Sequence, residues 1–394
     1  MKLVFCIAGT INYGGMERVL SQRVNYFVEK FGYDITIITT ENDSKVYKNK
    51  SPFFYFSPKI KIIDIGIKYA DFFEQNNGEG IYNFIKRQIK LKKIRKKHLL
   101  LLNENLKNIK PDILVCMGQN DRVIGSKVSF PCKKILENHF NKQFFTQELE
   151  NKNFFGRIKS LGKTYMEYSN IKKYDEFLVL TDEDKKAWGN EKIKVISNPL
   201  SFVSEKVSNC KNKKIISVGR LSNEKGFDIL IEVWKKVREK HKDWILEIYG
   251  EGYLRKELQD KIDSLNLRNT LILKGNEKDI KAKYLENSVY VMSSRFEGFG
   301  MTLIEAMSCG LPLVSFDCPY GPRKIIKNGE NGFLVKFGNI DEMAKKINYL
   351  IENEDKRIEI GKKSKELSYN YSEEKIMKQW KELFEKMDYN ERKS

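Results

Sequence analysis

Short runs of β-branched residues alternate with helical stretches along the whole chain, and this alternation is the feature that most constrains the fold. In the first half the predicted strands cover residues 2–9, 33–40, 59–66, 112–118, 133–139, 176–181 and 194–199. The pattern then restarts, with predicted strands at 213–219, 244–250, 270–275, 289–294, 311–316 and 332–337. Strands that alternate with helices form parallel sheets whose two faces are covered by helices. The sequence therefore predicts an α/β protein with two such sheets.

The restart near residue 213 indicates two domains, which the length of 394 residues also favours, because one hydrophobic core rarely covers so long a chain. We predict a first domain at 1–200, a polar linker at 201–212 and a second domain at 213–370. After residue 340 the pattern is helical, and a last helix at 371–394 is expected to return to the first domain.

Cysteine usage and the absence of long apolar runs favour a protein that stays in the cytoplasm. Each apolar run is broken within about ten residues, whereas a membrane-spanning helix needs about 20. The first nine residues fit a β-strand better than a signal peptide, because no small-residue cleavage site follows them. The six cysteines show no C-x-x-C spacing, which argues against a zinc site or a disulfide framework.

The net charge of +19 comes from 72 basic and 53 acidic residues. Residues 1–190 hold 33 basic and 21 acidic residues, a net charge of +12, which leaves +7 for the rest of the chain. Such an excess favours a polyanionic partner. Nucleic acid, an anionic membrane surface and a phosphate-bearing substrate all qualify, but the chain contains no recognisable RNA- or DNA-binding module. We therefore expect no nucleic-acid partner.

Ligands of open parallel sheets bind beyond the carboxyl ends of the strands, and unusual residues gather in the turns that follow those ends. The turn from Gly9 to Arg18 runs from a strand into a helix that starts near Gly15, where backbone N–H groups favour an anion. It lacks the G-x-G-x-x-G spacing of a dinucleotide site. In the turn from Gly219 to Gly226, Arg220 and Lys225 can both reach one diphosphate.

The third turn joins Arg295 to Glu305 and carries two carboxylates eight residues apart. Glu297 falls in a glycine-bearing loop, and Glu305 lies one to two turns into the following helix, so both can face one ligand. A carboxylate that accepts two hydrogen bonds suits a vicinal diol such as ribose. Glu305 is flanked by apolar residues, where an unpaired carboxylate would be costly.

These turns resemble the donor half of family 4 retaining glycosyltransferases with the GT-B fold. The resemblance is carried by SVGRLSNEKGFDIL, IYGEGYLRKEL, SSRFEGFGMTLIEAMSCGLPLVSF and GPRKIIKNGENGFLV, and a Gly-Gly-Met-Glu turn resembles the amino-terminal domain of that family. It covers residues 2 to about 385 and is most similar to bacterial polysaccharide and lipid-linked oligosaccharide transferases of the amylovoran galactosyltransferase type. It implies two Rossmann-like, doubly wound domains that face each other across a cleft.

The resemblance also implies roles for individual residues. Arg220 and Lys225 would hold the diphosphate and stabilise the leaving group, and Glu305 would bind the ribose hydroxyls. Glu297 would contact the donor sugar, and His139 would lie beside the reacting sugar carbon. The implied catalytic residues are Glu297, His139, Arg220 and Lys225. The implied donor-binding residues are Gly14, Gly15, Arg220, Lys225, Gly250, Glu297, Phe299, Gly300, Met301, Thr302 and Glu305.

Two departures from the family pattern stand out. The family often has Glu-His or Trp-Glu-His before Phe-Asn, whereas this chain has Glu137, Asn138 and His139 in that order. Any of the three could face the reacting carbon. The usual GPREII is GPRKII here, with Lys324 in place of the acid, which bears on sugar or acceptor preference.

The expected reaction is transfer of a hexose, with retention, from a nucleotide-diphosphate sugar to a saccharide or lipid-linked saccharide in surface glycan synthesis. The expected donor is a UDP-hexose such as UDP-galactose, UDP-glucose or a UDP-N-acetylhexosamine, with no metal or other cofactor. A sugar-nucleotide epimerase or hydrolase on the same fold is one alternative. A basic nucleic-acid-binding protein and an inactive sugar-nucleotide sensor are the others.

Two basic segments of the first domain indicate peripheral attachment to the inner face of the cell membrane. Residues 84–97 contain eight basic residues and no acid, with apolar positions mainly along a helical stripe. Residues 154–159 place two phenylalanines beside cations. Cations near an anionic leaflet favour reversible docking. The acidic run Asp182–Asp184 follows Thr181 and is predicted to be a capped helix start rather than a metal site.

Overall fold

The computed structural model describes residues 1–11, 14–42, 51–75, 81–139, 169–189 and 193–391. The chain divides into two compact units. Unit 1 comprises Met1–Leu180, Lys185–Ile196 and Met377–Ser394, and unit 2 comprises Thr181–Asp184 and Ser197–Ile376. The C-terminal segment from Met377 therefore belongs with the first sheet, although it follows the second in sequence.

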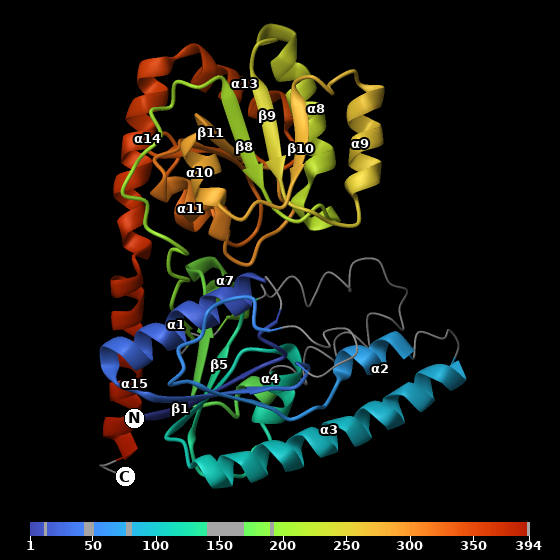
Figure 1. Ribbon diagram of the computed structural model, residues 1–394, viewed down its shortest axis with the longest axis vertical. Coiled ribbons are helices and arrows are strands. Elements are labelled where there is room, and N and C mark those ends of the chain that lie inside the picture. The colour runs from blue at the N-terminus through green and yellow to red at the C-terminus, as the bar shows by residue number, and fades with distance from the viewer. Residues whose placement is uncertain (12–13, 43–50, 76–80, 140–168, 190–192, 392–394) are drawn as a thin grey trace. The chain divides into compact units, whose positions relative to one another are not determined.

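Unit 1 is built on a seven-stranded parallel sheet with the strand order β3-β2-β1-β4-β5-β6-β7. Its strands are β1 (Lys2–Ile7), β2 (Asp34–Thr39), β3 (Lys61–Asp64), β4 (Ile113–Cys116), β5 (Lys133–Glu137), β6 (Glu176–Val179) and β7 (Lys194–Val195). Its helices are α1 (Gly15–Phe31), α2 (Tyr69–Gln75), α3 (Ile81–Ile109) and α4 (Gln119–Gly125), and the last parts of α7 (Asp182–Trp188) and α15 (Glu373–Glu391), whose first residues fall in unit 2, also belong to it. Helices lie on both faces of the sheet, and α1 and α15 lie side by side on one of them (Figure 1).

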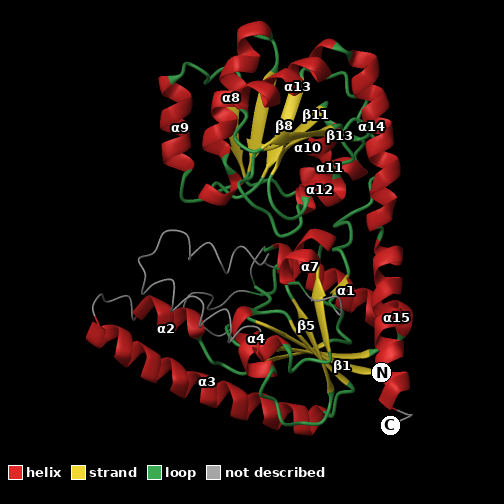
Figure 2. Cartoon of the chain, turned by 180° about the vertical axis from the view of Figure 1, so that it is seen from behind, coloured by secondary structure: helices red, strands yellow, loops and turns green. Residues whose placement is uncertain are grey.

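Unit 2 is built on a six-stranded parallel sheet with the order β10-β9-β8-β11-β12-β13. Its strands are β8 (Lys214–Val218), β9 (Ile245–Tyr249), β10 (Leu271–Gly275), β11 (Val289–Met292), β12 (Leu313–Asp317) and β13 (Gly332–Lys336). Its helices are α8 (Phe227–Lys240), α9 (Arg255–Ser264), α10 (Ile280–Leu285), α11 (Met301–Ser308), α12 (Pro322–Ile325), α13 (Ile340–Glu352) and α14 (Glu354–Ser368). They cover both faces, as the alternation predicts (Figure 2).

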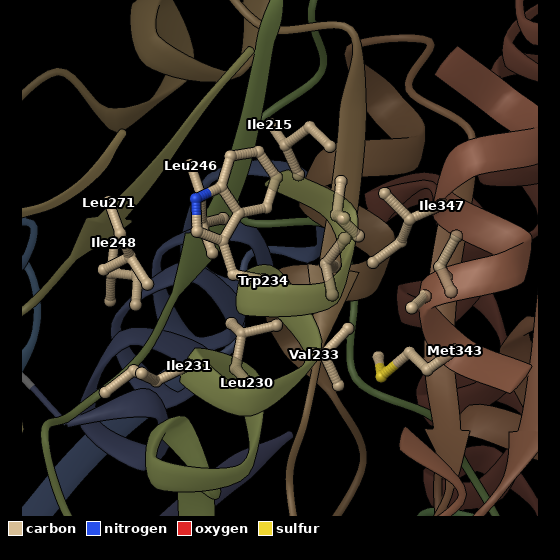
Figure 3. Packing of buried hydrophobic residues seen from close by; sticks show 14 of the residues in the cluster. Ile215, Leu230, Ile231, Val233, Trp234, Leu246, Ile248, Leu271, Met343 and Ile347 are labelled. Carbon is tan, nitrogen blue, oxygen red and sulfur yellow. The ribbon is translucent and has the colours of Figure 1, made fainter. Parts of the chain in front are cut away.

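The core of unit 2 forms where α8 and α13 pack on the sheet. Trp234 of α8 is 1% exposed and lies against β-strand residues such as Ile215 and Leu246 (Figure 3). Its indole Nε1 donates a hydrogen bond to Oγ1 of Thr270 at 3.3 Å, so the ring is buried without leaving its N–H unpaired. Met343 of α13 closes the same cluster. This packing fixes the sheet whose strand ends carry the site.

The predicted linker at 201–212 has no helix or strand, and α14 holds it in place. Arg357, which is 2% exposed, donates from Nε to the carbonyl of Cys210 at 2.7 Å. Lys365 donates from Nζ to the carbonyl of Ser204 at 2.5 Å. Both cations satisfy carbonyl groups that the irregular backbone leaves unpaired.

The strand orders locate the expected binding edges. In each sheet the first strand lies inside the sheet, and the chain changes direction between β1 and β4 and between β8 and β11. Ligands of such sheets bind at this switch point, beyond the carboxyl ends of the strands. Among the described residues, no helix is long and apolar enough to cross a membrane.

Candidate active site

The loop after β8 carries two cations, Arg220 and Lys225, which differ in the contacts they make with the described residues. Arg220 is exposed, and none of the described residues forms a hydrogen bond or ion pair with its side chain. The short 3₁₀ turn Asn223–Lys225 follows, and it ends at Gly226, whose φ is 63°. A Cβ atom at Gly226 would lie 2.2 Å from the carbonyl oxygen of Ser293, so only glycine fits against the neighbouring loop.

Lys225 and Glu297 form the contact that joins the β8 loop to the β11 loop. Nζ of Lys225 lies 2.7 Å from Oε1 of Glu297. The hydroxyl of Ser294 donates to the same oxygen at 2.6 Å. The Glu297 side chain is 9% exposed and that of Lys225 is 23% exposed, so the pair is partly shielded from solvent. Two residues that the sequence assigned to one ligand are therefore in contact with each other.

A second ion pair supports the same two loops, and the sequence analysis missed it. Arg295 binds Asp228 in a bidentate fork, with Nη1–Oδ1 at 2.8 Å and Nη2–Oδ2 at 2.7 Å. Nη1 of Arg295 also donates to the carbonyl of Asn223 at 2.8 Å. The hydrogen bonds from Arg295 lower the pKa of Asp228, so the acid stays charged. This fork holds the turn that carries Lys225 against the loop that carries Glu297.

Glu305 lies in α11 and is 2% exposed, which confirms the expectation that its carboxylate needs partners. Ser201 donates to Oε1 at 2.6 Å, and the Tyr284 hydroxyl donates to Oε2 at 3.1 Å. Burial and the Glu305 charge raise the pKa of Tyr284 well above its ordinary value, which keeps the phenol protonated as a donor. Both oxygens of Glu305 are thus held by hydroxyl donors, and a carboxylate is the kind of group that accepts hydrogen bonds from a diol.

The start of α11 contains the next expected donor residues. Gly300, with a φ of 93°, precedes Met301, the first residue of the helix. The N–H of Leu303 donates to the carbonyl of Gly300 at 3.0 Å, and the N–H groups at the start of a helix generally favour an anion. Thr302 accepts a hydrogen bond at Oγ1 from the hydroxyl of Tyr290 at 2.6 Å. Phe299 is 3% exposed and packs edge-on against Tyr371, so its side chain serves packing.

Gly250 lets the loop after β9 pass under the loop after β8. Its φ is 138°, and a Cβ atom there would lie 2.0 Å from the carbonyl oxygen of Gly219. Its N–H donates to the carbonyl of Gly275 at 2.8 Å. Gly250 therefore packs directly against the backbone of the loop that carries Arg220. Nine of the expected donor residues thus lie in unit 2: Arg220, Lys225, Gly250, Glu297, Phe299, Gly300, Met301, Thr302 and Glu305. All of them except Glu305 lie in the loops or helix starts that follow its strands.

Gly14 and Gly15 lie in unit 1, where α1 begins after β1. Gly15 is exposed, and Gly14 precedes the helix in an extended conformation. Glu17 is buried in the first turn, and a Cβ atom at Gly14 would lie 2.2 Å from its Oε2. A carboxylate of this chain therefore already lies against the helix start that the sequence assigned to a phosphate. Residues 12 and 13 of the same motif lie outside the described residues.

The end of β5 holds the three residues that the sequence could not separate. Glu137 is 2% exposed, and both of its carboxylate oxygens are bound by Arg23 of α1, at 2.5 and 2.6 Å. Asn138 is also buried, whereas His139 is the least buried of the three. His139 Nε2 lies 3.1 Å from Oε1 of Glu137. The following residues, 140 and 141, lie outside the described residues.

The acidic run Asp182–Asp184 forms the first turn of α7 and behaves as a capped helix start. The N–H of Asp184 donates to Oγ1 of Thr181 at 3.1 Å, as the sequence predicts. Lys324 pairs with Asp182, and Nη1 of Arg323 lies 3.0 Å from Oε1 of Glu183. The lysine that departs from the family pattern thus has an acidic partner. Within the described ranges, no group of three or more metal-binding side chains is placed to hold an ion.

Comparison with known proteins gives one family. Residues 202–367 match the family model described as glycosyl transferases group 1. The chain is 31% identical over 388 residues to an uncharacterized glycosyltransferase of Haemophilus influenzae. The match covers 96% of this chain and 99% of that protein. It is also 26% identical over 398 residues to the amylovoran biosynthesis glycosyltransferase AmsD of Erwinia amylovora. That match covers 97% of this chain and 99% of AmsD.

The fold agrees with solved glycosyltransferase structures. A mutant of Staphylococcus aureus TarM, in complex with Fondaparinux, alpha-GlcNAc-glycerol and UDP, matches with a TM-score of 0.73 and 20% identity, over 97% of this chain and 99% of that chain. With two parallel Rossmann-like sheets, the predicted GT-B fold class is confirmed. Together with the nearly full-length match to the H. influenzae relative, these findings show that the chain belongs to the group 1 glycosyltransferases.

Proposed function

We propose that this glycosyltransferase moves a hexose, with retention of anomeric configuration, from a UDP-sugar to a saccharide or lipid-linked saccharide. The observation that carries the proposal is the set of charges at one edge of the unit 2 sheet. Arg220 is exposed with no partner among the described residues, Lys225 and Glu297 form an ion pair, and Glu305 is a buried carboxylate that Ser201 and Tyr284 hold in place. The UDP bound in the TarM structure supports UDP as the leaving group.

The ion pair between Lys225 and Glu297 can open when a diphosphate binds. A diphosphate that approaches Arg220 competes with Glu297 for Lys225, because it offers the same charge-assisted bond and carries more negative charge than one carboxylate. Lys225 then stabilises the leaving diphosphate. Glu297 is released to accept hydrogen bonds from the sugar hydroxyls, while Glu305 accepts from the ribose. The two glutamates that the resemblance assigns to the donor thus contact different parts of it.

Retention follows, in this proposal, from displacement on the same face of the sugar. Retaining glycosidases use two carboxylates that flank the scissile bond, one of them as nucleophile. Here Glu297 and Glu305 are assigned to donor contacts. We therefore propose an oxocarbenium-like transition state, stabilised electrostatically where the negative charge of the diphosphate develops. His139 would contact the reacting sugar. The alternative of an epimerase or hydrolase predicts donor turnover at full rate without acceptor.

The acceptor class is proposed from relatives. AmsD acts in amylovoran biosynthesis, and the TarM complex holds a saccharide, Fondaparinux, and a glycosylated glycerol. We propose a surface-glycan acceptor that is either a free saccharide or linked to a lipid. A screen of UDP-galactose, UDP-glucose and UDP-N-acetylhexosamines against such acceptors, with mass spectrometry of the products, identifies the pair.

The two cations of the loop after β8, Arg220 and Lys225, should determine the kcat of sugar transfer. Arg220→Ala and Lys225→Ala each remove a contact to the leaving diphosphate, and each should lower kcat by about 10²–10³-fold. The measurement is UDP release with the donor and acceptor found in the screen. Lys235→Ala is the matched control, because Lys235 is an exposed lysine of α8. Turnover within a few-fold of wild type in both site variants would contradict the proposed leaving-group role.

We also propose that the reaction needs no metal. Arg220 and Lys225 supply the positive charge that a divalent cation supplies in other nucleotide-sugar enzymes. Transfer measured in excess EDTA should therefore equal transfer in buffer alone. A loss of activity in EDTA that added Mg²⁺ or Mn²⁺ restores would show instead that the diphosphate requires a bound cation.

Peripheral membrane attachment in the cytoplasm is proposed from α3. Leu91 of this helix is buried against Tyr69 and Phe72, so part of its apolar stripe is used for packing. Ile89, by contrast, is 55% exposed. The exposed lysines of this stretch are Lys86, Lys90, Lys92, Lys93, Lys96 and Lys97. The second basic segment, 154–159, lies outside the described residues, so the proposal rests on α3.

Charge reversal of four of these lysines tests the attachment. Each cation near an anionic leaflet contributes roughly 1 kcal/mol to binding, so Lys92→Glu, Lys93→Glu, Lys96→Glu and Lys97→Glu together should abolish flotation with anionic vesicles. The matched control reverses four exposed lysines of unit 2 and changes the net charge equally: Lys235→Glu, Lys240→Glu, Lys242→Glu and Lys256→Glu. Equal flotation of the wild type with neutral and anionic vesicles, or no flotation, would refute attachment through α3.

A further inference from the structure

A buried ionic cluster lies at the carboxyl end of β5, between α1 and α15. Arg23 is 1% exposed and Glu137 is 2% exposed, and they form the bidentate pair described above. The Arg23 guanidinium also lies over the ring of Trp380, 4.1 Å from its centre. Burying two charges costs solvation energy that their attraction only partly offsets, and an apolar pair of similar size often packs as well. The fold of unit 1 alone does not call for these charges.

The cluster touches one candidate catalytic residue. Oε1 of Glu137, which Arg23 binds, is also 3.1 Å from Nε2 of His139; the two atoms are close but not aligned as a hydrogen bond, so the contact is electrostatic. Burial alone would raise the pKa of Glu137, but the charges of Arg23 and His139 hold it well below its usual range. Glu137 is therefore a fixed carboxylate beside one nitrogen of the imidazole. A carboxylate there favours a proton on Nε2 and leaves Nδ1 unprotonated in the neutral ring.

We propose that Glu137 is a positioning residue that sets the tautomer and orientation of His139, and that Arg23 and Trp380 fix Glu137 in place. This inference rests on the proposed function, in which His139 contacts the reacting sugar. Arg23 comes from α1, Glu137 from β5 and Trp380 from α15, so three distant segments of sequence meet at the Arg23 guanidinium, and only Glu137 contacts the imidazole.

A merely structural role for the cluster makes a different prediction. In that case the ion pair only anchors α15, whose Trp380 and Phe384 already pack on Phe27 of α1. Any replacement that restores packing would then restore activity. The double variant Arg23→Met with Glu137→Gln separates the two roles, because it removes both buried charges together and leaves neither unpaired.

The double variant should keep the wild-type unfolding temperature within a few degrees. Its kcat should fall by about tenfold or more, with the donor KM nearly unchanged, because an orienting carboxylate acts on the imidazole rather than on substrate affinity. In a His139→Ala background the same double change should have no further effect on kcat. A double variant with wild-type kcat overturns the inference. If the wild-type protein itself transfers no sugar from any UDP-sugar, the proposed function fails, which is a distinguishable result.

The tautomer of His139 can be measured without an activity assay. The chain has three histidines, so ¹⁵N labelling of histidine gives a spectrum that His98→Asn and His241→Asn variants assign. In the wild type, the ¹⁵N shifts should place the proton of neutral His139 on Nε2. In the Arg23→Met, Glu137→Gln variant, the two tautomers should become mixed. Identical His139 shifts in both proteins would overturn the inference, whatever the activity assay gives.

Discussion

The ion pair between Lys225 and Glu297 is the contact on which the candidate donor site depends. It joins the loop after β8 to the loop after β11, at the point where the chain changes direction across the sheet. The Arg295–Asp228 fork holds the same loops at a second point. Because each partner comes from a different strand end, the site exists only when the parallel sheet has formed.

The charges in this site are arranged so that an anion can replace one of them. Lys225 is paired with Glu297, while Arg220 is exposed and has no partner among the described residues. Glu305 differs, because Ser201 and Tyr284 hold both of its oxygens and fix the carboxylate before any ligand arrives. In our account the first arrangement responds to the leaving diphosphate, and the second provides a preformed contact to the ribose.

Much of the architecture could be predicted from the sequence, because the period of hydrophobic residues reports local structure directly. The strand–helix alternation predicted two parallel sheets, and the apolar surroundings of Glu305 predicted a carboxylate with partners. The partners themselves could not be predicted. Ser201 lies 104 residues from Glu305 in sequence, and Asp228 lies 67 residues from Arg295, so no local pattern predicts these contacts.

The order of Glu137, Asn138 and His139 shows the same limit. Sequence spacing left all three as candidates, since a shift of one residue exchanges the faces of a strand. Only the contact with Arg23, which is 114 residues away, shows that the Glu137 carboxylate is already bound. The start of α1 is a similar case, because the glycines predicted an anion site and the buried Glu17 already lies there.

A crystal structure of the protein with UDP tests the central claim most directly. The account predicts that the diphosphate lies within hydrogen-bonding distance of Arg220 and Lys225, that the ribose hydroxyls contact Glu305, and that the 2.7 Å contact between Lys225 and Glu297 has opened. UDP bound at another place on the chain, or bound at this edge with the Lys225–Glu297 pair intact and no phosphate contact to either cation, would contradict it.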